Sequence, residues 1–327
     1  MRVVVTQELP TAELERMQEA GLEVVGPLAA GPPARDVLLG ALAGADALVC
    51  LLTDQVDEEL LDVAPRLRVV ANVAVGYDNV DVAAAAARGV VVTNTPGVLT
   101  DATADLTFAL LLAVARRIPE ADAAVRAGRF PRWGLFQELL GLEVTGAQIG
   151  IVGLGRIGGA VAARASLGFG MQVRYVGGRP DPSARWAGDA REVCWDELLA
   201  ESDYVTLHAP LTEQTRHLVD AAALARMKPS AVLINTARGP LVDERALAQA
   251  LAAGRLAGAG LDVFEREPEI EAALLATRRT VLTPHVGSAT AATRRRMAAL
   301  AVDNVLAVAA GRPPPTPVAV RPGRPSG

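Results

Sequence analysis

The sequence predicts an α/β protein with two domains: a Rossmann-type, doubly wound parallel sheet and a flavodoxin-like α/β domain, with a cleft between them. Three observations predict this class. Short runs of Val, Leu and Ile alternate with helical patterns, and because the runs are continuous they are typical of parallel strands buried on both faces. A glycine-rich turn, Gly153-Leu154-Gly155-Arg156-Ile157-Gly158, follows one of these runs. The 327 residues are enough for two domains with separate cores.

The N-terminal region alternates apolar runs with helical patterns. We predict strands over residues 3–5, 22–25, 47–51, 68–75 and 90–93, and helices over residues 12–20, 34–43, 57–63 and 82–88. The segment Thr95-Pro96-Gly97 ends this region because its residues favour a turn. Residues 1–98 are therefore predicted to form the first domain.

A long apolar helix predicted over residues 101–116 leads into the second domain, residues 99–287. Its predicted strands cover residues 149–152, 172–176, 204–208, 231–236, 258–263 and 280–283, and its predicted helices cover 156–167, 196–200, 221–227 and 243–253. A final helix over residues 291–310 has no strand to follow there. We therefore expect residues 288–327 to return to the first domain, with partial or complete disorder in the proline-rich tail that begins at Gly311.

The glycine turn and the helix after it indicate a dinucleotide site. Two glycines leave room where a side chain would block a pyrophosphate, a third lets helix and strand touch, and the helix directs unpaired N–H groups at the phosphates. A lone motif of this kind is a weak signal. Here it lies between two predicted strands, and Ile157, Val161 and Ala165 fall on one face of the intervening helix, so the βαβ context is present.

The end of the next strand favours NADP(H). An NAD site carries an acid about 20 residues past the turn, but no acid occurs between Gly153 and Asp181. The strand instead ends in Gly177-Gly178-Arg179, so Arg179 is predicted to pair with a 2′-phosphate. The alternative is that Arg179 is a solvated loop charge, which leaves NAD possible.

Composition excludes several classes. The net charge of -5 argues against a nucleic-acid partner. The apolar runs are short and the N-terminus begins a strand, so we expect neither a membrane span nor a signal peptide. Cys50 and Cys194 have no partner spacing, which favours reduced, buried thiols and a cytoplasmic location. The histidines at 208, 217 and 285 match no zinc-ligand spacing, so no metal site is expected.

Arg238, Glu267 and His285 each follow one of the last three predicted strands. Parallel strands bring their carboxyl ends to one edge of a sheet, where α/β proteins bind ligands. A guanidinium, a carboxylate and an imidazole are thus predicted to converge on one crevice. Taken singly, each would more often be a surface charge or a structural histidine.

Several motifs resemble signatures of the D-isomer-specific 2-hydroxyacid dehydrogenases. They are Asn235-Thr236-Ala237-Arg238-Gly239, Gly260-Leu261-Asp262-Val263-Phe264 with Glu267-Pro268, Pro284-His285-Val286-Gly287-Ser288, and the segments at residues 73–81 and 99–105. The similarity runs from about Val49 to Pro315, and within the family the chain most resembles glyoxylate and hydroxypyruvate reductases.

This resemblance implies roles for the polar residues. Arg238 would clamp the substrate carboxylate and carbonyl, which suits a planar bidentate donor. His285 would protonate the carbonyl oxygen, and Glu267 would stabilise the protonated imidazole. The backbone N–H groups of Val75 and Gly76 would also hold the substrate, which makes the first domain the substrate-binding (catalytic) domain.

The second domain would then bind the cofactor, NADP in preference to NAD. The predicted cofactor contacts are Gly153, Gly155, Arg156, Ile157, Gly158, Gly177, Gly178, Arg179, His208, Pro210, Thr215, Thr236, Ala237, Arg238, Asp262, His285 and Gly287. Asp262 would lie near the nicotinamide, and His208 beside the adenosine half.

The implied activity is reduction of glyoxylate or hydroxypyruvate, with the product a D-2-hydroxy acid. Alternatives on the same scaffold are 3-phosphoglycerate, phosphite and formate dehydrogenases, and a non-catalytic dinucleotide-sensing corepressor of the C-terminal binding protein type. The family is usually dimeric through the cofactor domain, so we expect a homodimer, with the apolar helix over residues 101–116 as a candidate contact.

Overall fold

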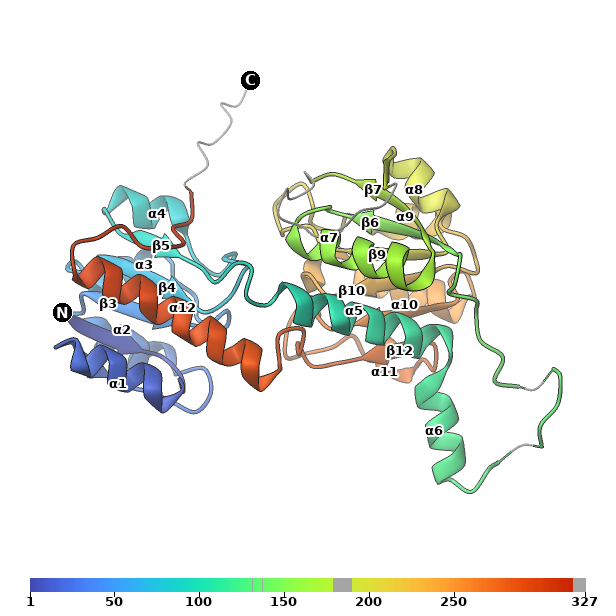
Figure 1. The fold of residues 1–327 in the computed structure, drawn as a ribbon, viewed down its shortest axis with the longest axis horizontal. Helices are drawn as coiled ribbons and strands as arrows, with labels where there is room; N and C mark the ends of the chain where they lie inside the picture. The colour runs from blue at the N-terminus through green and yellow to red at the C-terminus, as the bar shows by residue number, and fades with distance from the viewer. Residues whose placement is uncertain (131, 137, 179–189, 320–327) are drawn as a thin grey trace. The chain divides into compact units, whose positions relative to one another are not determined.

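A computed structural model describes residues 1–130, 132–136, 138–178 and 190–319, and the chain divides into two compact units (Figure 1). Unit 1 comprises Met1–Leu99 and Ala289–Gly327, and unit 2 comprises Thr100–Ser288. These boundaries lie one residue from the predicted ones. No helix in the described ranges is both long and apolar enough to cross a bilayer.

Unit 1 contains a parallel sheet with the strand order β2-β1-β3-β4-β5. The strands are β1 (Arg2–Val5), β2 (Glu23–Val25), β3 (Ala47–Cys50), β4 (Val69–Asn72) and β5 (Val91–Thr93). This is the flavodoxin-like order, as predicted. Every residue of β3 and β4 is buried, which explains their continuous apolar sequences.

Helices cover both faces of this sheet (Figure 1). On one face lie α2 (Arg35–Leu42), α3 (Glu58–Val63) and α4 (Val82–Ala87), and on the other lie α1 (Thr11–Glu19) and α12 (Ala291–Ala309). Strand residues alternate between the two cores: Val4 packs in the first, and Val3 and Val5 pack in the second with Val302 and Val305 of α12.

The segment after α12 pairs with the edge of this sheet. Val318 N–H donates to the Val92 carbonyl at 2.8 Å, and the Thr316 hydroxyl donates to the Asn94 carbonyl at 2.6 Å. The disorder predicted for the tail therefore does not apply to these residues. Their side chains and backbone find partners on β5 and α12 that a proline-rich composition does not reveal. Residues 320–327 of that prediction lie outside the described ranges.

Unit 2 contains a parallel sheet with the strand order β12-β11-β10-β9-β6-β7-β8 in the described residues. The strands are β6 (Gln148–Val152), β7 (Gln172–Val176), β8 (Arg191–Glu192), β9 (Tyr204–Leu207), β10 (Val232–Asn235), β11 (Gly258–Leu261) and β12 (Thr280–Leu282). The order reverses between β6 and β9, which is the Rossmann arrangement and confirms the predicted fold class. Ligands bind at the carboxyl ends beside such a reversal.

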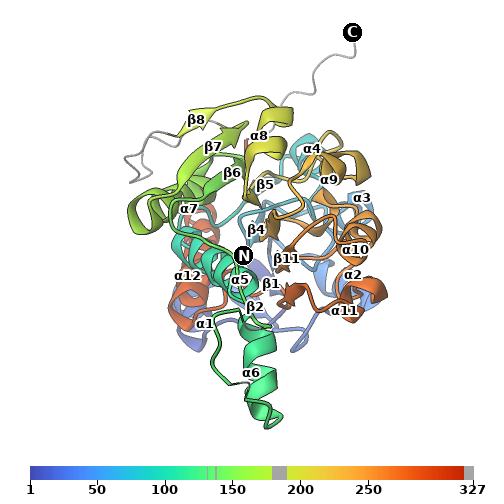
Figure 2. The same ribbon diagram turned by 90° about the vertical axis from the view of Figure 1, so that its right-hand side faces the viewer.

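Figure 2 shows this sheet between two layers of helices. One layer contains α5 (Thr100–Ala115) and α7 (Arg156–Ala163), which continues as a π-helical turn, Arg164–Gly168. The other contains α8 (Trp195–Glu201), α9 (Ala221–Arg226), α10 (Glu244–Ala252) and α11 (Ala272–Ala276). The helix α6 (Ile118–Arg126) extends away from both layers and buries none of its residues.

Some elements were not predicted from the sequence. They are α6, which buries none of its residues, and α11 and β8, which at five and two residues are too short to show a period. The prediction that Cys194 is buried is wrong, since only Cys50 of the two free thiols is buried.

Candidate active site

The three polar residues singled out by their position lie on neighbouring strands. β10, β11 and β12 are adjacent in the sheet, and Arg238, Glu267 and His285 follow their carboxyl ends. All three belong to unit 2, together with the glycine turn after β6. One edge of one sheet therefore carries every one of these groups.

Glu267 and His285 form a hydrogen-bonded pair. The imidazole Nδ1 lies 2.8 Å from Glu267 Oε2, and the other oxygen of Glu267 accepts from the Phe264 N–H at 3.0 Å. Burial acts to raise the pKa of Glu267, but the hydrogen bond and charge of His285, the Phe264 N–H and the charge of Arg238 outweigh it and lower that pKa. Glu267 is therefore ionised at neutral pH, and its contact at Nδ1 orients the ring so that Nε2 is the nitrogen that does not face Glu267.

Asp262 holds the loop that carries His285. Its carboxylate is almost fully buried and accepts hydrogen bonds from the Thr283 hydroxyl at 2.6 Å and from the N–H groups of Val286 and Gly287 at 2.8 Å each. Burial raises the pKa of Asp262, and these donors offset the shift only in part. His285 has a φ of 53°, a left-handed conformation that costs a residue with a side chain about 1–2 kcal/mol. The Asp262 contacts hold the loop in this conformation.

The turn that carries Arg238 is closed by Asn235, the last residue of β10. Its amide donates to the Arg238 carbonyl at 2.8 Å, and its side-chain oxygen accepts from the Ala237 N–H at 3.0 Å. The Arg238 guanidinium donates to the Ala237 carbonyl at 2.8 Å. The Thr236 hydroxyl lies 2.9 Å from that of Thr107 on α5 and is buried. The turn is thus fixed on both sides of the arginine.

The glycine turn meets the steric requirements of a dinucleotide site. A Cβ on Gly153, whose φ is 92°, would lie 2.9 Å from the His208 backbone, and one on Gly158 would lie 2.2 Å from the Gly153 carbonyl oxygen. A Cβ on Gly155 would meet nothing within 4 Å. Gly155 is the N-cap of α7, with no side-chain cap. The first and third glycines therefore close the turn, and the second leaves space at the helix N-terminus for a pyrophosphate.

This difference between glycines predicts two distinguishable variants. We expect Gly158→Ala to lower the thermal midpoint, because the added carbon overlaps the Gly153 carbonyl. Gly155→Val should lower the midpoint less than Gly158→Ala, since it only weakens the N-cap of α7, but it should weaken NADPH binding at least about tenfold, because its side chain occupies open space where phosphates approach. Thermal unfolding and fluorescence titration with NADPH measure both. Unchanged NADPH affinity in Gly155→Val would contradict the placement of the pyrophosphate.

The end of β7 carries glycines where an NAD-binding enzyme has an acid. Gly177 and Gly178 both have positive φ, and the Leu154 N–H donates to the Gly177 carbonyl at 3.0 Å. A Cβ on Gly178 would lie 2.7 Å from the Leu154 nitrogen, so no side chain fits at this position. Arg179, the residue predicted to bind a 2′-phosphate, lies outside the described residues.

The remaining predicted cofactor contacts also lie in unit 2. Arg156 and Ile157 begin α7, Gly287 packs against Asp262, and Pro210 and Thr215 belong to the loop after β9, where the Thr215 hydroxyl donates to the Pro210 carbonyl at 2.8 Å. His208 Nε2 lies 2.9 Å from the Thr206 hydroxyl. Burial lowers the pKa of His208 to about 3, so this imidazole is neutral at physiological pH and supplies no positive charge to a phosphate.

The neutral His208 predicts acid-sensitive stability. The unfolded chain takes up this proton near the ordinary pKa of 6.5, whereas the folded chain takes it up only near a pKa of about 3. Between these values the unfolded state binds more protons, so the free energy of unfolding falls as the pH falls, by up to about 1.4 kcal/mol per pH unit. Thermal midpoints at pH 7 and 5 should therefore drop less in His208→Gln than in the wild type. An equal drop in both proteins would show that His208 is solvated.

Val75 and Gly76 lie in unit 1, in the loop after β4. Their carbonyls accept hydrogen bonds from the side-chain amides of Asn94 at 2.7 Å and Asn72 at 2.9 Å. Asn72 in turn contacts Asn79, whose amide donates to the carbonyls of Leu51 and Asp54. The loop is thus held by side-chain amides, and these polar residues in an apolar stretch are the sequence signal that points to it.

Several residues that shape the site were missed from the sequence. Asn235 and Thr283 form the bonds described above, and His217, Glu244 and Glu265 form a hydrogen-bonded group behind the loops of Arg238 and Glu267. The role of Asn235 could have been predicted from the sequence, because Asn at a strand end commonly closes a turn. The others depend on contacts between segments far apart in the chain.

Comparison with known proteins agrees with this geometry. Residues 108–287 match the model of the D-isomer specific 2-hydroxyacid dehydrogenase NAD binding domain. A glyoxylate reductase from Thermococcus litoralis is 52% identical over 287 residues, covering 86% of each chain, and one from Korarchaeum cryptofilum is 48% identical over 316 residues, covering 96% of this chain and 94% of its own.

Solved structures agree as well. An NADPH-dependent glyoxylate/hydroxypyruvate reductase from Sinorhizobium meliloti, in complex with NADP and malonate, is 38% identical and superposes with a TM-score of 0.83 over 97% of this chain and 96% of that one. A Thermus thermophilus protein is 49% identical with a TM-score of 0.89, over 98% of this chain and 100% of that one. The Rossmann order, the glycine turn, the strand-end residues and these similarities lead to one conclusion: the chain belongs to the D-isomer-specific 2-hydroxyacid dehydrogenase family.

Proposed function

We propose that the protein is an NADPH-preferring reductase of glyoxylate and hydroxypyruvate. The observation that carries the proposal is the 2.8 Å contact between His285 Nδ1 and Glu267 Oε2. The charge of Arg238 contributes to the lowered pKa of Glu267. These residues lie at the carboxyl edge of the sheet that also carries the glycine turn. The relatives named glyoxylate reductase support the substrate class.

In this proposal some residues bind the substrate and others transfer the proton. Bound NADPH supplies a hydride to C2 of the 2-oxo acid. His285 gives a proton from Nε2 to the carbonyl oxygen, which leaves a hydroxyl group on C2 and a neutral imidazole. Glu267 stabilises the protonated ring before transfer. Arg238 pairs with the substrate carboxylate and polarises the carbonyl, and the N–H groups of Val75 and Gly76 hold the carboxylate.

Cofactor preference rests on the glycines at the end of β7. Because Gly178 admits no side chain, this position carries no carboxylate to repel a 2′-phosphate. The NADPH-dependent reductase from Sinorhizobium meliloti supports the same preference. Arg179 is proposed as the residue that pairs with the phosphate.

An NADPH- and NADH-consumption panel tests this proposal. We expect kcat/KM with NADPH to exceed that with NADH at least about tenfold, and turnover of glyoxylate and hydroxypyruvate to exceed that of pyruvate and phosphohydroxypyruvate. A clear preference for NADH would overturn the cofactor assignment. Turnover of phosphohydroxypyruvate alone would indicate a 3-phosphoglycerate dehydrogenase, and NADPH binding without any turnover would indicate a sensor.

We also propose a homodimer through unit 2, in which a second surface joins the predicted helix as a candidate contact. Seven of the 16 residues of α5 are buried, among them Phe108, Leu110 and Leu111, which pack in the core of their own unit. The segment after α6 instead exposes large apolar side chains: Phe130 is 80% exposed, Trp133 83% and Phe136 85%. Exposed apolar groups at this density are typical of interaction surfaces.

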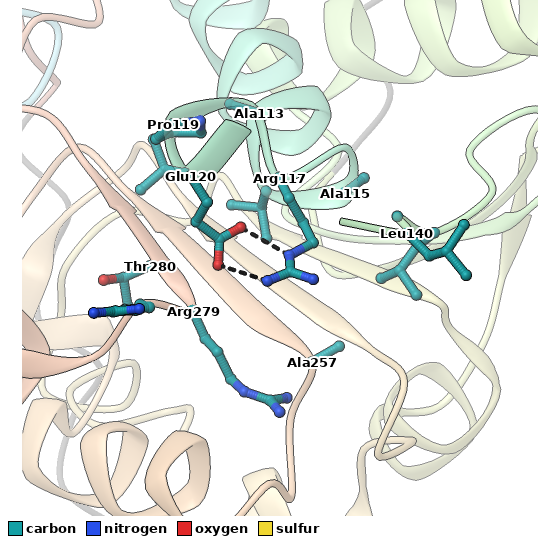
Figure 3. Close-up of a pocket in the computed structure, with 14 residues that line it drawn as sticks. Ala113, Ala115, Arg117, Pro119, Glu120, Leu140, Ala257, Arg279 and Thr280 are labelled. Carbon is teal, nitrogen blue, oxygen red and sulfur yellow. Dashed lines mark hydrogen bonds and ion pairs between the residues drawn. The ribbon is translucent and has the colours of Figure 1, made fainter. Parts of the chain in front are cut away.

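A cavity of about 340 Å³ adjoins this segment (Figure 3). Leu140 and Pro119 line it, together with Arg117, which pairs with Glu120. It lies at the amino ends of β11 and β12, the edge of the sheet opposite His285. A second copy of the chain is the proposed occupant of this surface. Sedimentation equilibrium should give twice the mass of one chain, and a monomer at micromolar concentration would contradict the proposal.

A further inference from the structure

A hydrogen-bonded group of His217, Glu244 and Glu265 lies behind the proposed catalytic residues. His217 Nε2 is 2.5 Å from Glu265 Oε1. Glu244 N–H donates to Glu265 Oε2 at 3.3 Å, and Glu265 N–H donates back to Glu244 Oε1 at 2.5 Å. Each glutamate thus binds the backbone of the other, and His217 takes the remaining oxygen of Glu265.

These three residues join the loops that carry Arg238 and Glu267. Glu265 lies two residues before Glu267, and Glu244 begins α10, directly after the loop that starts at Arg238. The His217 N–H donates to the Pro240 carbonyl at 2.8 Å, so His217 contacts one loop by its backbone and the other by its ring. The φ of His217 is 51°, which shows that its backbone is held in a left-handed conformation.

The two loops touch with no room between them. A Cβ on Gly239 would lie 1.8 Å from the Phe264 carbonyl carbon. Phe264 N–H also donates to Glu267, the partner of His285. A shift of Glu265 relative to Glu244 would therefore move Phe264, and with it Glu267, relative to Arg238.

The pKa of the buried Glu244 depends on its neighbours, including Glu265 of the same group. Glu244 is almost fully buried, and burial raises its pKa; the N–H groups of Glu265 and Glu271 act against that shift, and the nearby carboxylates of Glu265 and Glu271 add to it. Of these two carboxylates, that of Glu265 is the one that His217 Nε2 contacts.

We propose that His217, Glu244 and Glu265 are positioning residues that set the distance between Arg238 and the Glu267–His285 pair. None of the three is assigned contact with substrate or cofactor. The inference rests on the proposed function, since it concerns the geometry of that same site.

Kinetics of matched variants test the proposal. His217→Leu removes the ring contact, His217→Gln keeps a donor that reaches Glu265, and Glu265→Gln removes the charge. Glu269→Gln is the control, because it removes a negative charge from an exposed residue of the same loop without breaking the contact between His217 and Glu265. We expect His217→Leu and Glu265→Gln to lower kcat about 10- to 100-fold with NADPH affinity within about twofold, because small misplacements at a reacting centre have effects of this size. His217→Gln should recover most of the rate, and Glu269→Gln should match the wild type.

A double variant adds a second criterion. His217→Leu combined with Glu265→Gln should lose no more activity than either single variant, because both break the same contact. The rate of each variant is compared with that of the wild type. Rates within about twofold of the wild type for both single variants, or equal losses in His217→Leu and His217→Gln, would overturn the positioning role.

A readout without turnover separates this inference from the proposed function. The chain has only three histidines, so the imidazole ¹H–¹⁵N signals of His285 can be assigned. His217→Leu should shift the His285 signals, and Glu269→Gln should leave them unchanged. If the wild type reduces no 2-oxo acid but the His285 signals shift, the proposed function fails and the positioning role stands. Unshifted signals in His217→Leu would overturn the positioning role whatever the wild type reduces.

Discussion

Replacing His285 by asparagine is expected to lower kcat for glyoxylate by about 10²- to 10⁴-fold while NADPH binding is retained. The imidazole is the group assigned to give a proton to the carbonyl oxygen, and neither Glu267, which is ionised, nor Arg238 can replace it at neutral pH. Asparagine is the informative substitution because His285 has a φ of 53°, a region that Asn tolerates better than most residues.

The comparison with alanine separates chemistry from backbone strain. His285→Ala should lose as much activity as His285→Asn but should also lower the thermal midpoint slightly, since alanine is less suited to a positive φ. Stopped-flow NADPH oxidation and fluorescence titration of NADPH give the rates and affinities. If either variant reduces glyoxylate at a rate near that of the wild type, His285 is not the proton donor.

Replacing Arg238 by lysine is expected to lower kcat/KM for glyoxylate by about two to three orders of magnitude, and replacement by glutamine by at least as much. Losing one partner of a desolvated charge pair typically costs about 2–5 kcal/mol. Lysine retains the charge but not the planar fork that pairs with a carboxylate and a carbonyl together. The Arg238 turn is closed by Asn235 and Thr236, so the backbone should keep its conformation in both variants.

Steady-state kinetics with glyoxylate and the midpoint of thermal unfolding measure this prediction. The midpoint and the affinity for NADPH should stay close to the wild-type values. A lysine variant with more than half of the wild-type kcat/KM would show that only the charge matters, and it would contradict bidentate binding by Arg238.

Much of the architecture could be predicted because the pattern that defines it is local. The glycine turn needs only residues 153–158 and the strand before them, and continuous apolar runs mark strands that are buried on both faces. The convergence of Arg238, Glu267 and His285 followed from one rule, that parallel strands end at the same edge. The pairing of Glu267 with His285 was implied by the family resemblance, and the two side chains lie 2.8 Å apart.

The supporting contacts could not be predicted because they join segments that only the folded chain brings together. The bond between His217 and Glu265 links residues 48 positions apart, and Asp262 binds the N–H of Gly287 25 positions away. The family resemblance placed Asp262 near the nicotinamide; the structure shows that its carboxylate also fixes the His285 loop. Whether the helix over residues 101–116 forms a subunit contact stays a prediction, because an apolar helix has a similar composition whether a partner or its own sheet covers it.

A single-turnover experiment tests the central claim most directly. Enzyme, one equivalent of NADPH and excess glyoxylate are mixed, and NADPH oxidation and glycolate formation are followed together in the wild type and in His285→Asn. The wild type should form one glycolate for each NADPH oxidised, and the variant should bind the cofactor equally well but react at least about 100-fold more slowly. Equal rates in the two proteins, or NADPH oxidation without glycolate, would contradict the account.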